Sequence, residues 1–551
     1  MSLPRDGLQP VPEETVRVAH AAFPNGNVYL RLRDELGTLF DDGLFTPVYA
    51  IEGQPALHPW RLALVSVMQF MENLSDRQAA QAVRARIDWK YALGLELSDE
   101  GFDFSALSEF RTRLVHGRLE QTLLDTLLTR CQERGWLKAR GRQRTDSTHI
   151  LGAVKALNQL ELVGETLRHA LNVLATVAPE WLRPQIPPEW FERYGERIED
   201  YRLPKEKTER AMLSATIGED GYTLLASIHQ TATQEEWAWL HELPAVRILE
   251  QIWAQQYRQV NGHAQRRTPK EMPPVSEWYR SPYDTDVRYG RKRDFDWLGY
   301  KVHVTECCDG DLPHLITQVE TTPATQQDHH ALKIIQAELA DKQLTPKEQL
   351  VDAGYISAKR ILESRDHYGI DLVGPVHVDP SWQARTPDAL DVSQFQVDWE
   401  GQVVICPQGA QSISWHRGKD AKGESVVQVW FAQPTCQACP LRSRCTTAQT
   451  TGRSMTLRFP PERHAMLQAA RLRQQTPAFH DMYRARCGVE GTFSQTTRNT
   501  GLRRARYIGQ RKTHLQHLLT ALATNVLRLV SWLEGVPFAN TRTSPFASLA
   551  A

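Results

Sequence analysis

Three acidic residues in different settings are the side chains of this sequence best suited to chemistry. Asp146 lies in a strand-like segment, Arg-Gln-Arg-Thr-Asp-Ser-Thr-His, and Asp352 ends a short apolar run, Gln-Leu-Val-Asp. Glu490 lies on an expected helix, in Arg-Cys-Gly-Val-Glu-Gly-Thr. Two carboxylates at strand ends and a third from a late helix could hold two divalent metal ions about 4 Å apart, an arrangement suited to attack on a phosphodiester. The sequence therefore indicates an enzyme that cuts and joins DNA.

The expected helix around Glu490 carries further polar residues at helical spacing. Tyr483, Arg486, Glu490 and Thr497 follow one another at intervals of 3, 4 and 7 residues. These intervals predict that all four side chains lie on one face of a single helix. A tyrosine, an arginine and an acid in one line favour a polar, anionic partner, and arginine matches a phosphate through two parallel hydrogen bonds.

The same region is locally basic, although the 551-residue chain has 65 basic and 65 acidic residues and no net charge. Residues 484–512 contain eight lysines and arginines and one acid, Glu490. Such a local excess favours contact with a polyanion, and the alternative is a solvated helical face. The DNA-contact candidates here, besides Tyr483 and Arg486, are Arg498, Arg503, Arg504, Arg506 and Lys512.

Four of the eight cysteines lie close together between residues 406 and 445. They are Cys406, Cys436, Cys439 and Cys445, and the middle two form a Cys-x2-Cys pair. Four thiolates at such spacing can hold a structural zinc ion, which stabilises a module with little apolar core of its own. The alternative is four reduced cysteines that pack a small core.

Residues 1 to about 135 are expected to be helical. Pro59 is placed for the first turn of a helix, and Ser75 with Gln78 has the spacing of a capping box. The helix that follows Ser75 should bury its alanines and turn Arg77, Arg84 and Arg86 outward. Short helices with outward arginines predict a helix-turn-helix-like DNA-binding domain, and the alternative is a bundle for dimerisation or packing.

Strand-like and helical segments alternate in the middle of the chain, which predicts an α/β fold with a mixed sheet. Strands are expected around Asp146, at 298–305, at 314–320, at 348–352 and at 370–376, with helices at 328–339 and 358–368. A second group of short strands is expected at 395–399, 402–406, 426–431 and 455–459. Asp284 and Asp286 precede the 298–305 strand and are rival candidates for the first acid.

Several segments resemble the DDE transposases of bacterial insertion sequences, and among these the group numbered eleven eighty-two. The resemblance covers roughly residues 30–535 and is most specific at Leu74–Ala80, Asp88–Gly94, Trp297–His303, Val351–Tyr355 and Gly488–Thr492. Related transposases carry a Tyr, Arg, Glu, Lys signature, which the chain matches at Tyr483, Arg486 and Glu490. It departs at the last position, where Thr497 is followed by Arg498.

The resemblance implies an α/β ribonuclease H-like catalytic domain with a mixed five-stranded sheet. The expected divisions are a helical DNA-binding domain (1–135), the catalytic domain (136–154, 284–378 and 461–535), a helical insert (155–283), a β-rich cysteine-containing insertion (379–460) and an irregular tail (536–551). Asp146, Asp352 and Glu490 would bind Mg²⁺ or Mn²⁺.

The implied function is a transposase that binds the ends of an insertion sequence, hydrolyses DNA and joins the 3′-OH to target DNA. The expected partners are double-stranded DNA and a second copy of the chain on that DNA, with no membrane. No apolar run reaches the length of a membrane span and the start lacks a signal-peptide core, so a cytoplasmic, nucleoid-associated location is expected. The alternatives are a ribonuclease H-like nuclease without strand transfer and a catalytically inactive DNA-binding protein.

Overall fold

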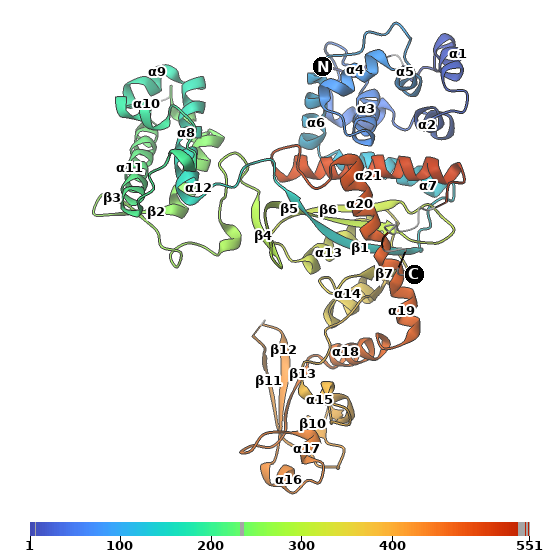
Figure 1. Cartoon of the computed structure of the whole chain (residues 1–551), viewed down its shortest axis with the longest axis vertical. Coiled ribbons are helices and arrows are strands. Elements are labelled where there is room, and N and C mark those ends of the chain that lie inside the picture. Colours follow the sequence, from blue (N-terminus) through green and yellow to red (C-terminus); the bar gives the residue numbers. More distant parts are fainter. Residues whose placement is uncertain (6, 232–235, 422, 538–545, 547–548, 550–551) are drawn as a thin grey trace.

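A computed structural model describes residues 1–5, 7–231, 236–421, 423–537, 546 and 549 (Figure 1). The predicted irregular tail, 536–551, lies mostly outside the described residues. Figure 1 shows a central sheet with helices above it, a helical lobe to one side and a small β-rich module below. Among the described residues, no helix is both long and apolar enough to cross a membrane.

The central sheet carries the first two acids. Its strands are β1 (Arg142–Leu151), β4 (Arg288–Lys292), β5 (Phe295–Cys307), β6 (Ile316–Pro323), β7 (Glu348–Val351) and β8 (Asp371–Val373). The order is β4-β5-β1-β7-β8, and β6 also pairs with β5. β1 runs antiparallel to β5 and parallel to β7, so the sheet is mixed as predicted.

The sheet has six strands, and the prediction of five is therefore wrong by one. β4 forms a hairpin with the beginning of β5, through a turn in which Arg293 adopts a φ of 56°. Only Gly290 of β4 is buried, because the strand lies at an exposed edge. Its sequence, Arg-Tyr-Gly-Arg-Lys, accordingly lacks the apolar pattern of a half-buried strand.

The N-terminal region is helical, as predicted, and shares its hydrophobic core with the sheet and the last long helix. Pro59 occupies the first turn of its helix, and the Ser75–Gln78 capping box is present. The helices are α1 (Glu13–Ala22), α2 (Val28–Leu36), η1 (Asp42–Val48), α3 (Pro59–Met71), α4 (Asp76–Ala85), α5 (Ile87–Leu93), α6 (Ser105–Gly117) and α7 (Glu120–Glu133).

The helical lobe lies between β1 and β4 and has a hydrophobic core of its own, in which Trp190 and Trp253 are buried. Its elements are α8 (Gln159–Val177), α9 (Pro179–Leu182), η2 (Arg183–Gln185), α10 (Pro188–Tyr194), η3 (Asp200–Arg202), α11 (Lys207–Thr231), η4 (Ala238–Glu242), α12 (Pro244–Gln256), β2 (Tyr257–Val260), β3 (His263–Arg266) and η5 (Val275–Glu277). The β2–β3 hairpin replaces the end of the predicted helical stretch.

The β-rich module follows β8, after helices α13 (Asp328–Asp341) and α14 (Ala358–Tyr368). All four predicted short strands are present, and β11, whose residues are mostly exposed, is an additional one. The elements are α15 (Trp382–Arg385), η6 (Val392–Gln394), β9 (Gln396–Asp398), β10 (Val403–Ile405), β11 (Ser412–Lys419), β12 (Ser425–Phe431), α16 (Gln433–Gln437), α17 (Arg442–Cys445) and β13 (Ser454–Arg458).

Helices return from the module to the sheet and end the described fold. They are α18 (Pro461–Arg473), α19 (Pro477–Arg484), η7 (Ala485–Cys487), α20 (Gly488–Thr500) and α21 (Gln510–Leu533). α21 is buried along most of its length between the sheet and the N-terminal helices (Figure 1). Through α21, the N-terminal helices and the sheet therefore share one hydrophobic core.

Candidate active site

Asp146 and Asp352 lie on neighbouring parallel strands at the same level. The β1–β7 register pairs Thr145 with Val351, so Asp146 is the next residue of β1 and Asp352 is the first residue after β7. Burial and the negative charge of Asp352 together raise the pKa of Asp146 above its usual value, although Ser147 and Arg486 act against this shift. Two neighbouring carboxylates, of which Asp146 is harder to ionise because of the charge of Asp352, form a site that a cation would stabilise.

Arg486 links the first acid to the third. Its guanidinium donates a 2.7 Å hydrogen bond to Asp146 and a 3.2 Å hydrogen bond to Glu490. The guanidinium also lies 5.8 Å from the centre of the Tyr483 ring. Its Nε is buried and has no hydrogen-bond partner in the described part of the chain. Arg486 thus places one positive charge among the three acids.

The expected single helix through Tyr483, Glu490 and Thr497 is interrupted, so that part of the prediction is wrong. Tyr483 lies near the end of α19, Arg486 lies in the 3-10 turn η7, and Glu490 lies in the first turn of α20. A Cβ atom at Gly488 would collide with the guanidinium of Arg144, so glycine permits the chain to approach β1 closely here. Arg486, in this turn, contacts Asp146. The predicted helical face did not include that contact.

Buried polar residues that the sequence analysis did not single out lie beneath the aspartates. Tyr355 is fully buried, and its hydroxyl shares a 2.6 Å hydrogen bond with His303 Nδ1. Burial and the charges of Asp328, Asp146 and Asp352 raise the pKa of Tyr355. A fourth carboxylate, Asp328, begins α13 and pairs with Lys301 at 3.0 Å. Its position close to Asp352 follows only from the fold, because the sequence offers no signal besides an acid at a helix start.

A buried ion cluster fixes the segment that carries Arg486 and Glu490. Glu306 on β5 is fully buried and accepts hydrogen bonds of 2.7 Å each from Arg144, Arg528 and Thr492. Burial alone would raise the pKa of Glu306, but the two arginines and the threonine hydroxyl keep the pKa below its usual value. Arg144 also donates to the carbonyl of Ala485 at 2.7 Å. The cluster therefore ties both ends of the segment 485–492 to the sheet.

The rival acids Asp284 and Asp286 serve the start of α21. Both carboxylate oxygens of Asp284 accept from the Tyr300 hydroxyl at 2.8 Å, and one also accepts from the Gly509 amide. Asp286 accepts from the Gln510 amide at 2.9 Å. These contacts occupy the two carboxylates as helix caps.

The basic DNA-contact candidates divide into two groups. Arg77, Arg84, Arg498, Arg504 and Lys512 are exposed. Arg86 instead forms ion pairs with Glu72 and Asp88, and Arg506 bonds to Asn73 and to the carbonyl of Leu74. The expectation that Arg86 turns outward is met only in part, because its side chain is 35% exposed while its guanidinium pairs with two acids of the N-terminal region.

Arg503 belongs to neither group. Its guanidinium lies 2.8–2.9 Å from the ring nitrogens of His149. Burial and the charge of Arg503 lower the pKa of His149 to about 4, so the ring is neutral near pH 7. The His149 ring also lies 4.6 Å from that of Phe295 and 5.6 Å from that of Trp297, which forms an aromatic and basic patch near the end of β1.

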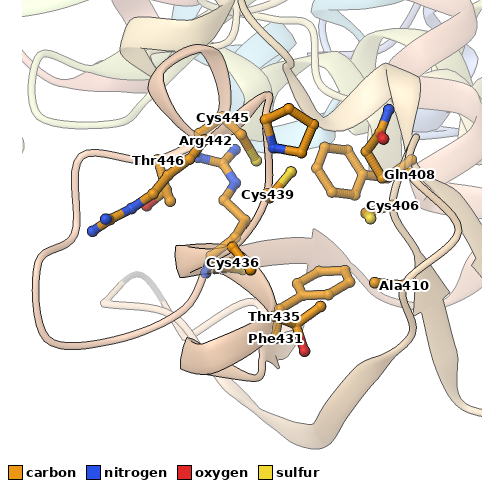
Figure 2. A pocket seen from close by; sticks show the side chains of 14 residues that line it. Cys406, Gln408, Ala410, Phe431, Thr435, Cys436, Cys439, Arg442, Cys445 and Thr446 are labelled. Atoms are coloured by element: carbon orange, nitrogen blue, oxygen red, sulfur yellow. Dashed lines mark hydrogen bonds between the residues drawn. The ribbon is translucent and has the colours of Figure 1, made fainter.

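The four cysteines between 406 and 445 line one cavity of about 230 Å³ in the β-rich module (Figure 2). They come from three segments: the turn after β10, the end of α16 with the residue pair beyond it, and the last residue of α17. The remaining cysteines, Cys131, Cys307, Cys308 and Cys487, lie elsewhere. The structure thus brings together the four cysteines singled out from their spacing.

The donor atoms at the acids suit a hard divalent cation, because Mg²⁺ and Mn²⁺ prefer carboxylate oxygens and retain several waters. Asp146 and Asp352 are the pair that fits, and Glu490, whose side chain is 67% exposed, is held toward Asp146 through Arg486. In the described residues, no three His, Cys, Asp or Glu side chains already form a metal-binding group. Binding of a cation by all three acids would therefore require their side chains to rearrange and Arg486 to release the oxygens that it contacts.

Comparison with protein families gives two matches in separate parts of the chain. A model described as a Transposase DDE domain matches residues 405–530, which contain Glu490 and the four cysteines but neither aspartate. A model described as a Transposase domain (DUF772) matches residues 18–113, in the N-terminal helices. Among curated proteins the chain finds no match. The two family matches, together with the mixed α/β fold, support a transposase with a DDE domain, and transposases act on DNA.

Proposed function

We propose that the chain is a transposase of a bacterial insertion sequence, of the group numbered eleven eighty-two, with a ribonuclease H-like catalytic domain. Asp146, Asp352 and Glu490 are its catalytic acids, and Mg²⁺ or Mn²⁺ is their cofactor. The observation that carries the proposal is the register that sets Asp146 beside Asp352, with Arg486 joining Asp146 to Glu490. The order β6-β5-β1-β7-β8, with two parallel strands after the antiparallel three, supports the fold assignment.

The residues of the site divide the work between metal binding and substrate binding. Bound divalent ions supply an activated water and stabilise charge on the reacting oxygens. Asp146 and Asp352 would hold the ions from the sheet, and Glu490 would complete the set from α20. Arg486, which bonds to two of these acids, would be free to contact a phosphate near the cut, beside Tyr483, once its carboxylate partners were engaged elsewhere. Exposed Arg498, Arg504 and Lys512 extend this contact along the DNA.

One site serves both reactions, since hydrolysis of a strand and attack by the freed 3′-OH are both in-line displacements at phosphorus. The N-terminal helices, through Arg77 and Arg84, bind the transposon ends. Two copies of the chain on DNA hold the two ends together, and the nucleoid of the cytoplasm is where they act. A nuclease without strand transfer and an inactive DNA-binding protein share much of this description.

A strand-transfer assay separates these functions. Purified protein is given DNA ends with free 3′-OH groups, a target plasmid and Mg²⁺. Joined products are expected for the parent protein and none for Asp352→Asn, while Asp352→Asn still binds the ends in a gel-shift assay. Cutting of intact ends without any joining would favour the nuclease. Binding without either reaction would favour the inactive DNA-binding protein.

A further inference from the structure

The β-rich module has a small hydrophobic core for its size. Its buried apolar side chains are Leu390, Phe395, Val404, Val427, Val429, Phe431, Met455 and Leu457. Cys406, Cys436 and Cys445 pack against this core while remaining partly exposed. Modules with so little apolar core are commonly stabilised by a disulfide or a bound metal. All eight cysteines of the chain are free thiols, so disulfides do not stabilise it here.

The backbone around the cysteines forms two tight turns. In Cys406-Pro-Gln-Gly409, the Gly409 amide donates to the Cys406 carbonyl at 2.8 Å, and Gly409 needs its φ of +80° to close the turn. In the second turn, the Cys439 amide donates to the Cys436 carbonyl at 3.4 Å. Each turn presents a thiol to the cavity, and two such turns can provide the ligands of a tetrahedral site.

Hydrogen-bond donors and two arginines lie around the thiols. The backbone amide of Arg453 donates to the sulfur of Cys436 at 3.4 Å, a contact that orients a thiolate ligand. The Arg453 side chain donates to the carbonyl of Cys445 at 3.0 Å, and Arg442 also lines the cavity. Four thiolates and one Zn²⁺ carry two net negative charges, which these two guanidinium groups would balance.

The four thiols share one cavity without yet being grouped around a single point. All four cysteines line the cavity and are partly exposed. Among the described residues they do not already form a metal-binding group. Each sulfur has three staggered χ1 positions, so the thiols can reorient within the cavity.

We propose that Cys406, Cys436, Cys439 and Cys445 bind one structural Zn²⁺ ion that holds the β-rich module together. The ion joins the turn after β10 to the α16–α17 segment, and it takes no part in DNA chemistry because all four coordination positions are filled by protein. The alternative is that the four thiols pack a small core without metal.

Elemental analysis of the full-length protein, purified without an affinity tag that binds metal, tests the proposal. About one zinc per chain is expected, as for other four-thiolate sites. The variant Cys436→Ser/Cys445→Ser should lose the zinc, and Cys487→Ser, which alters an exposed cysteine outside the module, should keep it. Absence of zinc from the parent protein, or its full retention by the double variant, would overturn the proposal.

A second measurement remains informative if the double variant folds poorly. Co²⁺ added to the parent protein after removal of zinc should give the intense visible and near-ultraviolet bands of tetrahedral thiolate coordination. The bands should be displaced by one equivalent of Zn²⁺, and the single variant Cys439→Ser should weaken or shift them. Parent protein that shows no such bands, and whose four cysteines react freely with a thiol reagent before zinc removal, would contradict the site.

Discussion

Arg144 and Glu306 form an ion pair of 2.7 Å from which water is excluded, since the Glu306 carboxylate is fully buried. Arg144 lies two residues before Asp146 on β1, and Thr492, which also binds Glu306, lies two residues after Glu490. A buried ion pair alone is weak support for stability, because desolvation offsets much of its attraction. Its value here is positional: it fixes α20 relative to the strand that carries the first aspartate.

Thr492→Val should therefore weaken catalysis through metal binding. The substitution removes the hydroxyl that donates to Glu306 and accepts from Arg528 while preserving the side-chain shape. Loss of one such buried hydrogen bond costs about 1–3 kcal/mol. We expect DNA cleavage to require several-fold more Mg²⁺, with a smaller fall in rate at saturating Mg²⁺.

Thr496→Val is the matched control for this change. Thr496 is buried one helical turn later, and within the described part of the chain its hydroxyl bonds only to carbonyls of its own helix. A magnesium titration of cleavage distinguishes the two variants. An equal shift of the Mg²⁺ requirement in both variants would show that general loosening of α20, and not the tie to Glu306, is responsible.

Arg486→Gln should strengthen binding of metal ions in the absence of DNA. The guanidinium bonds to both Asp146 and Glu490 and so competes with a cation for the same oxygens. Without it, we expect several-fold tighter Mn²⁺ binding by calorimetry, together with loss of DNA cleavage because the phosphate contact is removed. Arg498→Gln, at an exposed position, should leave Mn²⁺ binding unchanged. Weaker Mn²⁺ binding by Arg486→Gln would show that the arginine assists the site.

The basic residues of segment 484–512 should differ in role, some contacting DNA and others stabilising the fold. Arg498→Gln and Lys512→Gln each remove an exposed positive charge, so we expect weaker DNA binding, a salt slope smaller by about 1 in each variant, and an unaltered melting temperature. Arg506→Gln removes bonds to Asn73 and Leu74 and a guanidinium that lies 4.5 Å from the Phe70 ring. It should lower the melting temperature. Binding titrations at several salt concentrations and thermal melts provide the comparison.

Glu320 should make the fold less stable as the pH rises through neutrality. Burial and the charge of Glu338 raise the pKa of Glu320 to about 7. Its native carboxyl thus holds a proton that the unfolded chain releases near pH 4.5, so the stabilisation is complete below that pH and is lost as the pH rises to about 7. We expect Glu320→Gln to raise the melting temperature relative to the parent at about pH 8, and to change it little at about pH 4.5. A constant difference at both pH values would contradict this pKa.

The sequence predicted the elements better than their junctions. Apolar runs and capping signals located β7, α3, α4 and α14 closely, because burial and capping act over a few residues. The adjacency of Asp146 and Asp352 could be expected, since strands were predicted at both, although Asp146 lies within β1 and not at its end as predicted. The interruption at η7 could not be expected from local sequence, and neither could the close approach of Gly488 to Arg144, a residue of β1 that is remote in the chain.

Polar residues beneath the aspartates were also out of reach of sequence reasoning. Tyr355 and His303 carry no spacing signal, and their contact depends on how β5 and the turn after β7 meet. Arg86 and Arg506 show the opposite difficulty. Their basic character suggested DNA contact, whereas the fold supplies a carboxylate of α5 to Arg86 and a carbonyl between α3 and α4 to Arg506.

The helical lobe enters and leaves the sheet at one place, because Leu151 of β1 pairs with Gly299 of β5 and the Gly152 amide bonds to the Leu298 carbonyl. Arg288, the first residue of β4, also pairs with Gly299, so in topological terms the lobe is the connection between two strands that meet β5 at the same point. The length of such a connection has only a weak, logarithmic effect on the entropy of closing it. Evolution could therefore enlarge, shrink or exchange the helical lobe while β1 and β7, which position Asp146 and Asp352, kept their alignment.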